Sequence, residues 1–194
     1  MRKFVNKKRL PFLIAGLSLL VLAGQTLGWF KFGVQLASSD QPGLYEIDHF
    51  IDGDTIAVNM NGNIESIRFI GVDTPETHKP NTPVQCYGPT AAAFTKSTIG
   101  TQRVRLQSDP LSTDRDRYGR LLRYVYLPNG TLLDELLIQK GYGFAYTSFP
   151  FTKANQFTID ERQAQTARLG LWRACQPVRN QYGSYTSNPL TSSL

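Results

Sequence analysis

Carboxylates and arginines lie at the ends of short apolar segments, and together they could act on a phosphodiester. Asp54 lies in IDGDT, Arg68, Asp73 and Glu76 lie in IRFIGVDTPE, and Arg120 ends DRYGR. Carboxylate oxygens bind hard divalent cations, and planar guanidinium groups pair with phosphate through two hydrogen bonds. A further carboxylate can take a proton from water. We therefore interpret the set as a candidate site for metal-dependent phosphodiester hydrolysis in nucleic acid.

Each acid in this set also has a simpler explanation. Asp54 and Asp73, with the Thr74 carbonyl, could form an open cation site that leaves room for a phosphate oxygen. Asp-Gly pairs are common in turns, however, and either acid alone could be a turn residue. For Asp52 we favour the turn. A single loop glutamate such as Glu76 more often faces solvent than acts as a base. The acids alone leave both interpretations open.

The arginines and tyrosines have alternatives of the same kind. Arg68 is flanked by apolar residues and therefore needs a partner, which could be a phosphate or a carboxylate in a salt bridge. Arg120 follows Tyr118-Gly119 and could instead be a solvated loop residue. Tyr118 and Tyr146 could stack on bases, as aromatic side chains do in proteins that bind single strands, or could pack in the protein. These residues become informative only together.

Five short strands are expected between residues 44 and 127, because apolar and polar residues alternate between turn signals. Asn61-Gly62 is a strong hairpin signal between the second and third strands. The strands are expected at residues 44–50, 55–60, 64–72, 103–107 and 121–127. With interspersed helices, this pattern favours an α+β fold, but spacing alone does not distinguish a closed barrel from an open sheet.

Three helices are expected from their start and stop signals. The signals are Gly88-Pro89 for the first, Thr131 with Asp134 and a final Gly141 for the second, and Thr158 with Glu161 for the third. The expected buried residues are Leu133, Leu136 and Leu137 in the second helix and Ala164, Ala167 and Leu171 in the third.

The net charge of +6 does not by itself indicate nucleic-acid binding. Six of the 21 basic residues precede residue 40, whereas all 15 acidic residues lie at Asp40 or later, so 21 − 6 = 15 basic residues face 15 acids. The globular part is formally neutral, and attraction to phosphate must come from local placement of charge.

The N-terminus predicts a membrane signal. Residues 2–9 are basic and are followed by an apolar stretch over residues 11–30, a pattern typical of a signal peptide or a signal anchor helix. The following domain is then expected outside the cytoplasm, secreted or anchored. The alternative is a buried core helix. We expect a linker at 31–43, a folded domain at 44–175 and a disordered tail at 176–194.

The two cysteines, Cys86 and Cys175, are expected to form a disulfide. A membrane signal implies an oxidising compartment, where a pair of cysteines is normally oxidised. A zinc site is the alternative, but His49 and His78 lack ligand spacing to either cysteine.

Several ordered blocks resemble the staphylococcal nuclease (thermonuclease) family over residues 44–175. The blocks are IDGDTIAV, IRFIGVDTPET, YGPTAAAFTK, DRYGRLLRYVY, QKGYGFAY and RLGLW. The resemblance implies a five-stranded OB-fold barrel with three helices, here preceded by the N-terminal hydrophobic helix. It also implies a calcium-dependent nuclease that hydrolyses DNA and RNA, with single strands favoured, and leaves 3′-phosphates. The implied roles are calcium ligands for Asp54, Asp73 and the Thr74 carbonyl, phosphate contacts for Arg68 and Arg120, base or water orientation for Glu76, and nucleotide contacts for Tyr118 and Tyr146.

The sequence departs from the best-known family member in ways that bear on affinity. TSFPF follows Tyr146 without a further tyrosine, the loop after Glu76 has only Lys79 as a basic residue, and the globular part is neutral. A catalytically inactive OB-fold module that binds nucleic acid at the membrane is the main alternative. A membrane-tethered scaffold without a metal site is a third. Because the candidate acids and arginines are all present, we favour the nuclease, acting as a monomer.

Overall fold

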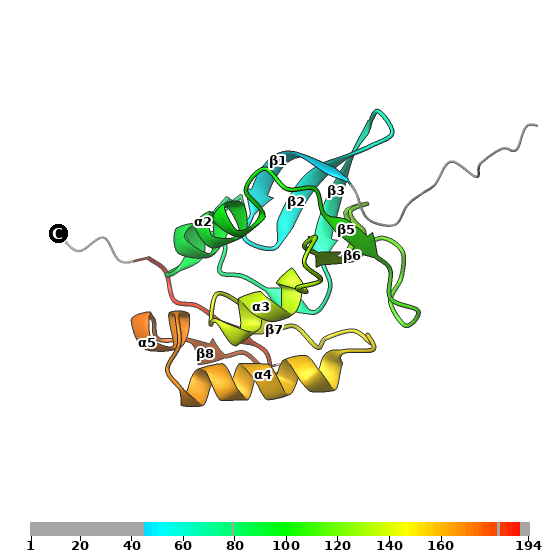
Figure 1. The fold of residues 1–194 in the computed structure, drawn as a ribbon. Helices are drawn as coiled ribbons and strands as arrows, with labels where there is room; N and C mark the ends of the chain where they lie inside the picture. The colour runs from blue at the N-terminus through cyan, green and yellow to red at the C-terminus, as the bar shows by residue number, and fades with distance from the viewer. Residues whose placement is uncertain (1–44, 79, 182, 191–194) are drawn as a thin grey trace, which may run out of the picture. The chain divides into compact units, whose positions relative to one another are not determined.

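The computed structural model describes residues 45–78, 80–181 and 183–190 (Figure 1). The expected N-terminal helix and linker lie outside these residues. Within the described part of the chain, no helix is both long and apolar enough to cross a membrane. The membrane signal therefore stays a prediction.

A five-stranded sheet forms the centre of the domain, with strand order β1-β2-β3-β6-β5. β1, β2 and β3 are consecutive antiparallel strands, β3 and β6 are parallel, and β5 is antiparallel to β6. The φ angles of Asn61 and Gly62 are 57° and 92°, so the predicted hairpin turn is confirmed. The strands are β1 (Glu46–Asp52), β2 (Thr55–Met60), β3 (Asn63–Phe69), β5 (Arg105–Gln107) and β6 (Leu121–Tyr126).

The sheet is not closed into a barrel by a continuous ladder of strands. Its edges, β1 and β5, approach each other at an isolated bridge between Tyr45 and Val104, where two backbone hydrogen bonds of 2.9 Å form. The mixed α+β class is confirmed and is consistent with an OB-fold, whereas the closed barrel is not shown.

The predicted strand over residues 64–72 is broken at its end, and this break positions part of the site. Gly71 has a φ of 73°, and a Cβ there would lie 2.5 Å from the Phe151 ring. The chain therefore turns after Phe69 and re-emerges as β4 (Val72–Asp73), which pairs with β7 (Phe144–Ala145) outside the main sheet. The turn directs Asp73 and the following residues back toward the β1–β2 turn.

Four helices are described, and their ends differ from the predicted ones. Pro89 lies in the first turn of α2, as predicted. The cap expected at Thr131 is wrong, because the N-cap of α3 is Leu132 without a side-chain bond. The cap expected at Thr158 is also wrong, because α4 begins four residues earlier. The helices are α2 (Gly88–Ile99), α3 (Leu133–Gln139), α4 (Ala154–Thr166) and α5 (Leu171–Ala174).

The bonds of Thr158 and Glu161 explain the error at the start of α4. Thr158 Oγ1 donates to the Ala154 carbonyl, and Glu161 accepts a hydrogen bond from the Ala145 amide of β7. Ala167 is exposed rather than buried, because the chain leaves the helix at that point. Leu171 is buried, but in α5. Thr158 thus bonds within α4, and Glu161 is used for a contact with β7 instead of a cap.

The core lies between the sheet and the helices. α3 contacts β6, β4 and α4, so it lies between the sheet and α4 (Figure 1). Each fully buried large apolar side chain contributes about 1.5–3 kcal/mol. Such side chains in the core include Ile56, Ile67, Phe69, Leu133, Leu137 and Phe157. Of the predicted face of α3, Leu133 and Leu137 are buried, whereas Leu136 is only partly buried against the core.

Beyond residue 175, the described residues 176–181 and 183–190 include paired backbone within the segment where we expected a disordered tail. β8 (Val178–Arg179) and β9 (Tyr185–Thr186) pair as a short antiparallel ribbon. The Tyr185 ring lies 4.9 Å from Trp172 and 6.0 Å from Phe144. The polar composition of the segment conceals this aromatic contact. The predicted disulfide between Cys86 and Cys175 is confirmed.

Asp134 links α3 to the sheet. It is fully buried in the first turn of the helix, and its Oδ2 accepts a hydrogen bond of 2.9 Å from the Val125 amide of β6. Burial raises the pKa of Asp134 well above its ordinary value, so the folded protein favours the protonated carboxyl.

Removing the disulfide should destabilise the domain. The bond joins residues separated by 89 positions, and closing a loop of that length contributes about 4 kcal/mol in the chain-entropy model. We expect the double variant Cys86→Ala/Cys175→Ala to lose a free energy of unfolding of that order, measured by urea unfolding. An unchanged midpoint with an unchanged slope would contradict this.

Asp134→Asn should change how stability depends on pH. The amide keeps an acceptor for Val125 but cannot ionise. In the unfolded wild type, Asp134 ionises near its ordinary pKa of 3.8, whereas the folded state keeps it protonated. Its stabilising contribution is therefore full below that pH and is lost as pH rises. In urea unfolding from about pH 4 to about pH 7, the variant should gain stability relative to wild type; a constant difference would argue against burial as the cause.

Candidate active site

One cavity of about 1180 Å³ brings the predicted site residues together. It opens where the β1–β2 turn, the β3–β4 segment, the loop before β6 and the segment after β7 meet. All eight residues that the sequence singled out line it, namely Asp54, Arg68, Asp73, Thr74, Glu76, Tyr118, Arg120 and Tyr146. Segments up to 92 residues apart (146 − 54) thus converge on a single cavity.

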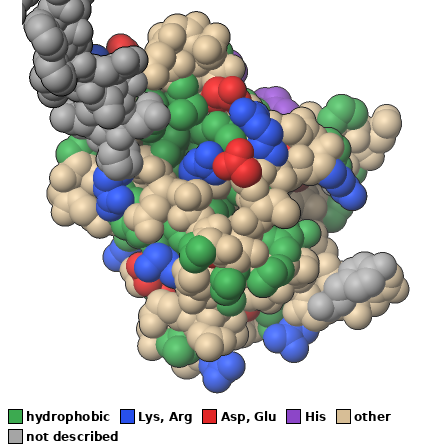
Figure 2. Space-filling view, turned by 90° about the vertical axis from the view of Figure 1, so that its right-hand side faces the viewer, with side chains coloured by type: hydrophobic (Ala, Val, Ile, Leu, Met, Phe, Trp, Pro, Cys, Tyr) green, Lys and Arg blue, Asp and Glu red, His purple; other side chains and the backbone are tan. Residues whose placement is uncertain are grey.

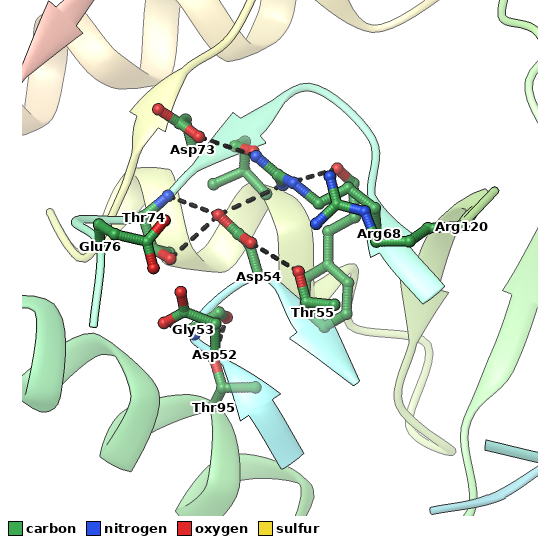
Figure 3. Close-up of polar contacts among 12 residues, drawn as sticks. Asp52, Gly53, Asp54, Thr55, Arg68, Asp73, Thr74, Glu76, Thr95 and Arg120 are labelled. Carbon is green, nitrogen blue, oxygen red and sulfur yellow. Dashed lines mark hydrogen bonds and ion pairs between the residues drawn. The ribbon is translucent and has the colours of Figure 1, made fainter. Parts of the chain in front are cut away.

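Asp54 lies at the centre of the polar contacts in the cavity (Figure 3). Its side chain is almost fully buried. Oδ2 accepts hydrogen bonds from the Thr74 amide at 2.7 Å and the Thr74 hydroxyl at 3.0 Å, and Oδ1 accepts one from the Thr55 hydroxyl at 3.0 Å. These donors orient the carboxylate. Asp54 therefore links the β1–β2 turn to the segment after β4.

Arg68 is the cation of this cluster. Its Nη2 lies 2.8 Å from Asp73 Oδ1, its Nη1 lies 3.2 Å from Asp54 Oδ2, and Nη1 also donates to the Val72 carbonyl at 2.7 Å. Burial opposes its charge, but the carboxylates of Asp54 and Asp73 outweigh burial and raise the pKa of Arg68. Of the two partners that the sequence allowed for Arg68, the structure shows carboxylates in salt bridges. The guanidinium also lines the cavity.

Asp52 and Glu76 form a second acidic pair on the other side of Asp54 (Figure 3). Asp52 Oδ1 accepts hydrogen bonds from the Gly53 amide at 2.8 Å and the Thr77 hydroxyl at 2.9 Å, and its carboxyl lies beside that of Glu76. Burial and then the charge of Asp54 raise the pKa of Asp52 to about 7. Asp52 is therefore more than the turn residue that we favoured.

Arg120 reaches the same cavity from the segment before β6. Its Nε lies 2.7 Å from Asp116 Oδ2, and its amide donates to Oδ1 of the same carboxylate. Burial opposes ionisation of Asp116, but the Arg120 side chain and the backbone hydrogen bonds outweigh it and lower the pKa. The Tyr118 ring is largely exposed and lies 5.4 Å from the Arg120 guanidinium carbon. Asp116 thus fixes Arg120, and Tyr118 lies beside it.

An apolar wall completes the cavity. Tyr146 is half-buried, and its ring lies 5.0 Å from that of Phe149 in an edge-to-face arrangement. Leu111 and Pro150 line the same side. Sequence reasoning missed Phe149; the aromatic residue in TSFPF after Tyr146 was the available signal. Aromatic and aliphatic side chains beside arginines are suited to contact a nucleobase whose phosphate the arginines bind.

The donor set of the cavity suits a hard cation that keeps part of its hydration. Asp54, Asp73 and the Thr74 carbonyl offer oxygen ligands only, which are the ligands that calcium prefers. Among the residues described, no group of three or more His, Cys, Asp or Glu side chains is placed to hold a metal ion. Any cation here would therefore depend on water, carbonyl or substrate oxygens for the rest of its shell.

Charge on the surface is mixed rather than gathered into a basic face. Figure 2 shows acidic and basic side chains next to one another on the face in view. Several arginines near the cavity are paired with acids, as Arg115 is with Glu65 and Arg123 with Asp114. This agrees with the neutral balance of the chain after residue 40, and it leaves recognition to the groups inside the cavity.

Comparison with known proteins decides the family. Residues 66–174 match the family described as staphylococcal nuclease homologue. The chain belongs to this family. It is 40% identical over 166 residues to Thermonuclease of Staphylococcus intermedius, covering 82% of this chain and 94% of that protein. The family and the names of its relatives support a nuclease, which is a hydrolase.

Two further relatives are longer than the region they share with this chain. SPbeta prophage-derived endonuclease YokF of Bacillus subtilis is 41% identical over 128 residues, covering 65% of this chain and 43% of YokF. Endonuclease YncB of the same organism is 41% identical over 136 residues, covering 69% of this chain and 64% of YncB. The chain thus spans less than two thirds of either relative.

Arg68→Met should destabilise the fold in the absence of added metal. The change leaves the buried carboxylate of Asp54 without its ion-pair partner, a loss that typically costs about 3–5 kcal/mol. Arg115→Met is the matched control, because its ion pair with Glu65 is much more exposed and its loss should have little effect. Urea unfolding in EDTA measures both. Equal effects for the two variants would contradict a structural role for the Arg68 cluster.

Proposed function

We propose that this protein is a calcium-dependent nuclease that acts outside the cytoplasm on DNA and RNA, with single strands favoured, and leaves 3′-phosphates. The observation that carries the proposal is the convergence of the acids, arginines and tyrosines on one cavity. Membership of the nuclease family supports the same reaction class.

The arginines are proposed to bind the scissile phosphate. Arg68 presents its guanidinium from β3, and Arg120 presents its own from the segment before the neighbouring strand β6, where Asp116 fixes it. Two guanidinium groups held in place stabilise the negative charge that accumulates on the phosphate oxygens during in-line displacement. Because both side chains are already ordered by carboxylates, little reorganisation is needed at the moment of reaction.

Glu76 is proposed to accept the proton of the attacking water. Water attacks phosphorus, its proton passes to Glu76, and the bond from phosphorus to the 5′ oxygen breaks. The 5′ oxygen takes a proton from solvent water and leaves as a hydroxyl, and the phosphate stays on the 3′ side. Asp54, Asp73 and the Thr74 carbonyl are the proposed calcium ligands. Calcium, when bound, would withdraw negative charge from the phosphate and favour attack on it. Tyr118 and Tyr146 are proposed to contact the nucleotide.

The proposed location rests on two observations. The disulfide between Cys86 and Cys175 is typical of oxidising compartments outside the cytoplasm. The basic and then apolar N-terminus is typical of a signal peptide or anchor. Both favour secretion or attachment to the membrane by residues 11–30.

Substitution at the cavity should remove calcium-dependent cleavage. We expect Glu76→Gln to lower kcat by about 10²–10⁴-fold, because a general base is lost. Arg120→Lys should lower it by about 10²–10³-fold, because a planar donor fork is lost. Labelled single-stranded DNA and RNA, digested with calcium or with EDTA and analysed for product ends, provide the measurement.

Matched controls come from the exposed ion pair between Arg103 and Glu46, which does not line the cavity. Arg103→Lys and Glu46→Gln should cleave like wild type. Wild-type protein that binds single strands in EDTA and forms no product with calcium would instead identify a binding module. Cleavage that persists in EDTA would exclude the calcium requirement.

A further inference from the structure

The segment that follows the family match folds back onto the loop after Glu76. We call residues 186–190 the C-terminal strap. The Cys86 amide donates to the Asn188 carbonyl at 2.8 Å, and the Leu190 amide donates to the Val84 carbonyl at 2.7 Å. The Ser187 hydroxyl donates to the Cys86 carbonyl at 2.9 Å. The strap thus pairs with residues 84–86 through an isolated antiparallel bridge between Gln85 and Pro189.

Gln85, at the centre of this pairing, holds the backbone of Glu76 from both sides. Its side-chain oxygen accepts a hydrogen bond of 2.8 Å from the Glu76 amide, and its own amide donates to the Glu76 carbonyl at 2.9 Å. The side-chain nitrogen of Gln85 donates to Thr186 Oγ1 of the strap at 3.3 Å. A single residue therefore links the strap to the proposed base.

Two further features limit movement of the same backbone. Gly88 opens α2 against the Glu76 segment so closely that a Cβ would lie 2.8 Å from the Glu76 carbonyl oxygen. The disulfide ties Cys86 to Cys175, directly before the segment that leads into β8. Gln85 therefore lies between the start of a helix, a disulfide and the bridged C-terminal strap, and its side chain is held by Glu76 and Thr186.

We propose that Gln85 is a positioning residue for the reaction, which holds Glu76 in place and is itself held by the C-terminal strap. The proposal rests on the proposed function, because it assigns Gln85 a role through Glu76. Gln85 does not line the cavity. Proton transfer depends steeply on geometry, and a displacement of about 1 Å can lower a rate about 10²-fold.

Gln85→Met tests the proposal in the full-length chain. Methionine keeps the length of the side chain but provides no acceptor for the Glu76 amide. We expect kcat to fall about 10-fold to 100-fold with KM unchanged, because substrate contacts are intact. Gln85→Glu keeps an acceptor and should retain more of the rate. Thr186→Val removes the acceptor for the side-chain nitrogen of Gln85 and should lower kcat by a smaller factor.

A double-variant cycle separates positioning from general destabilisation. In a Glu76→Gln background, Gln85→Met should lower the residual rate no further, because its effect acts through the lost carboxylate. Gln102→Met is the matched control; Gln102 is exposed, contacts its own neighbour Thr98 and lies outside the cavity lining. A full additional loss in that background, or wild-type kcat for Gln85→Met, would overturn the proposal.

Hydrogen exchange of the backbone provides a readout that does not depend on cleavage. Gln85→Met should increase exchange in the peptide that contains the Glu76 amide, and Gln102→Met should not. If the wild-type protein does not cleave although its Glu76 amide is protected from exchange, the proposed function and the catalytic role of Gln85 are both overturned. If wild type cleaves and exchange at Glu76 is unchanged by Gln85→Met, only the positioning role is overturned.

Discussion

The buried ion pairs of Arg68 are the interaction on which the site depends. A guanidinium with only 12% of its side chain exposed would be costly without partners, and Asp54 would be equally costly without Arg68. The pairing therefore constrains two segments at once, the β1–β2 turn and the chain that leaves β4. Gly53 permits this approach, because a Cβ there would lie 2.7 Å from the Thr74 hydroxyl oxygen. The groups proposed to do chemistry also determine how these segments meet.

Much of the fold could be predicted because periodicity and turn chemistry are local. Asn61-Gly62 specified its hairpin, and Pro89 specified the start of α2. The helix caps were not predictable, because Glu161 bonds to β7 and Asp134 bonds to β6, and such contacts between elements have no local signature. The paired segment after residue 175 was not predicted for a similar reason. Its composition is polar, yet its backbone pairs with residues about a hundred positions earlier. Backbone pairing over such a distance leaves no periodic pattern in the sequence.

The site was more predictable than its surroundings. Residue types suited to phosphate and metal stand in short blocks, and family resemblance added their order. Asp52 was set aside because Asp-Gly is an ordinary turn pair. In the structure the turn and the acidic cluster are the same feature, since the β1–β2 hairpin that ends β1 at Asp52 places it beside Glu76. Gln85 carried no chemical signal at all, because its contribution is the placement of another residue.

A neutral domain can still recognise a polyanion if its free energy of binding comes from a few enclosed groups. Most arginines around the cavity have a carboxylate partner, so little of their charge extends into solvent. The salt dependence of nucleic-acid binding grows with the number of phosphates that a protein contacts. For the proposed function, binding then depends on one phosphate between Arg68 and Arg120 and on apolar contact with neighbouring bases. In that proposal, contact of bases with the apolar wall at Tyr146 and Phe149 replaces the contribution of a broad basic surface.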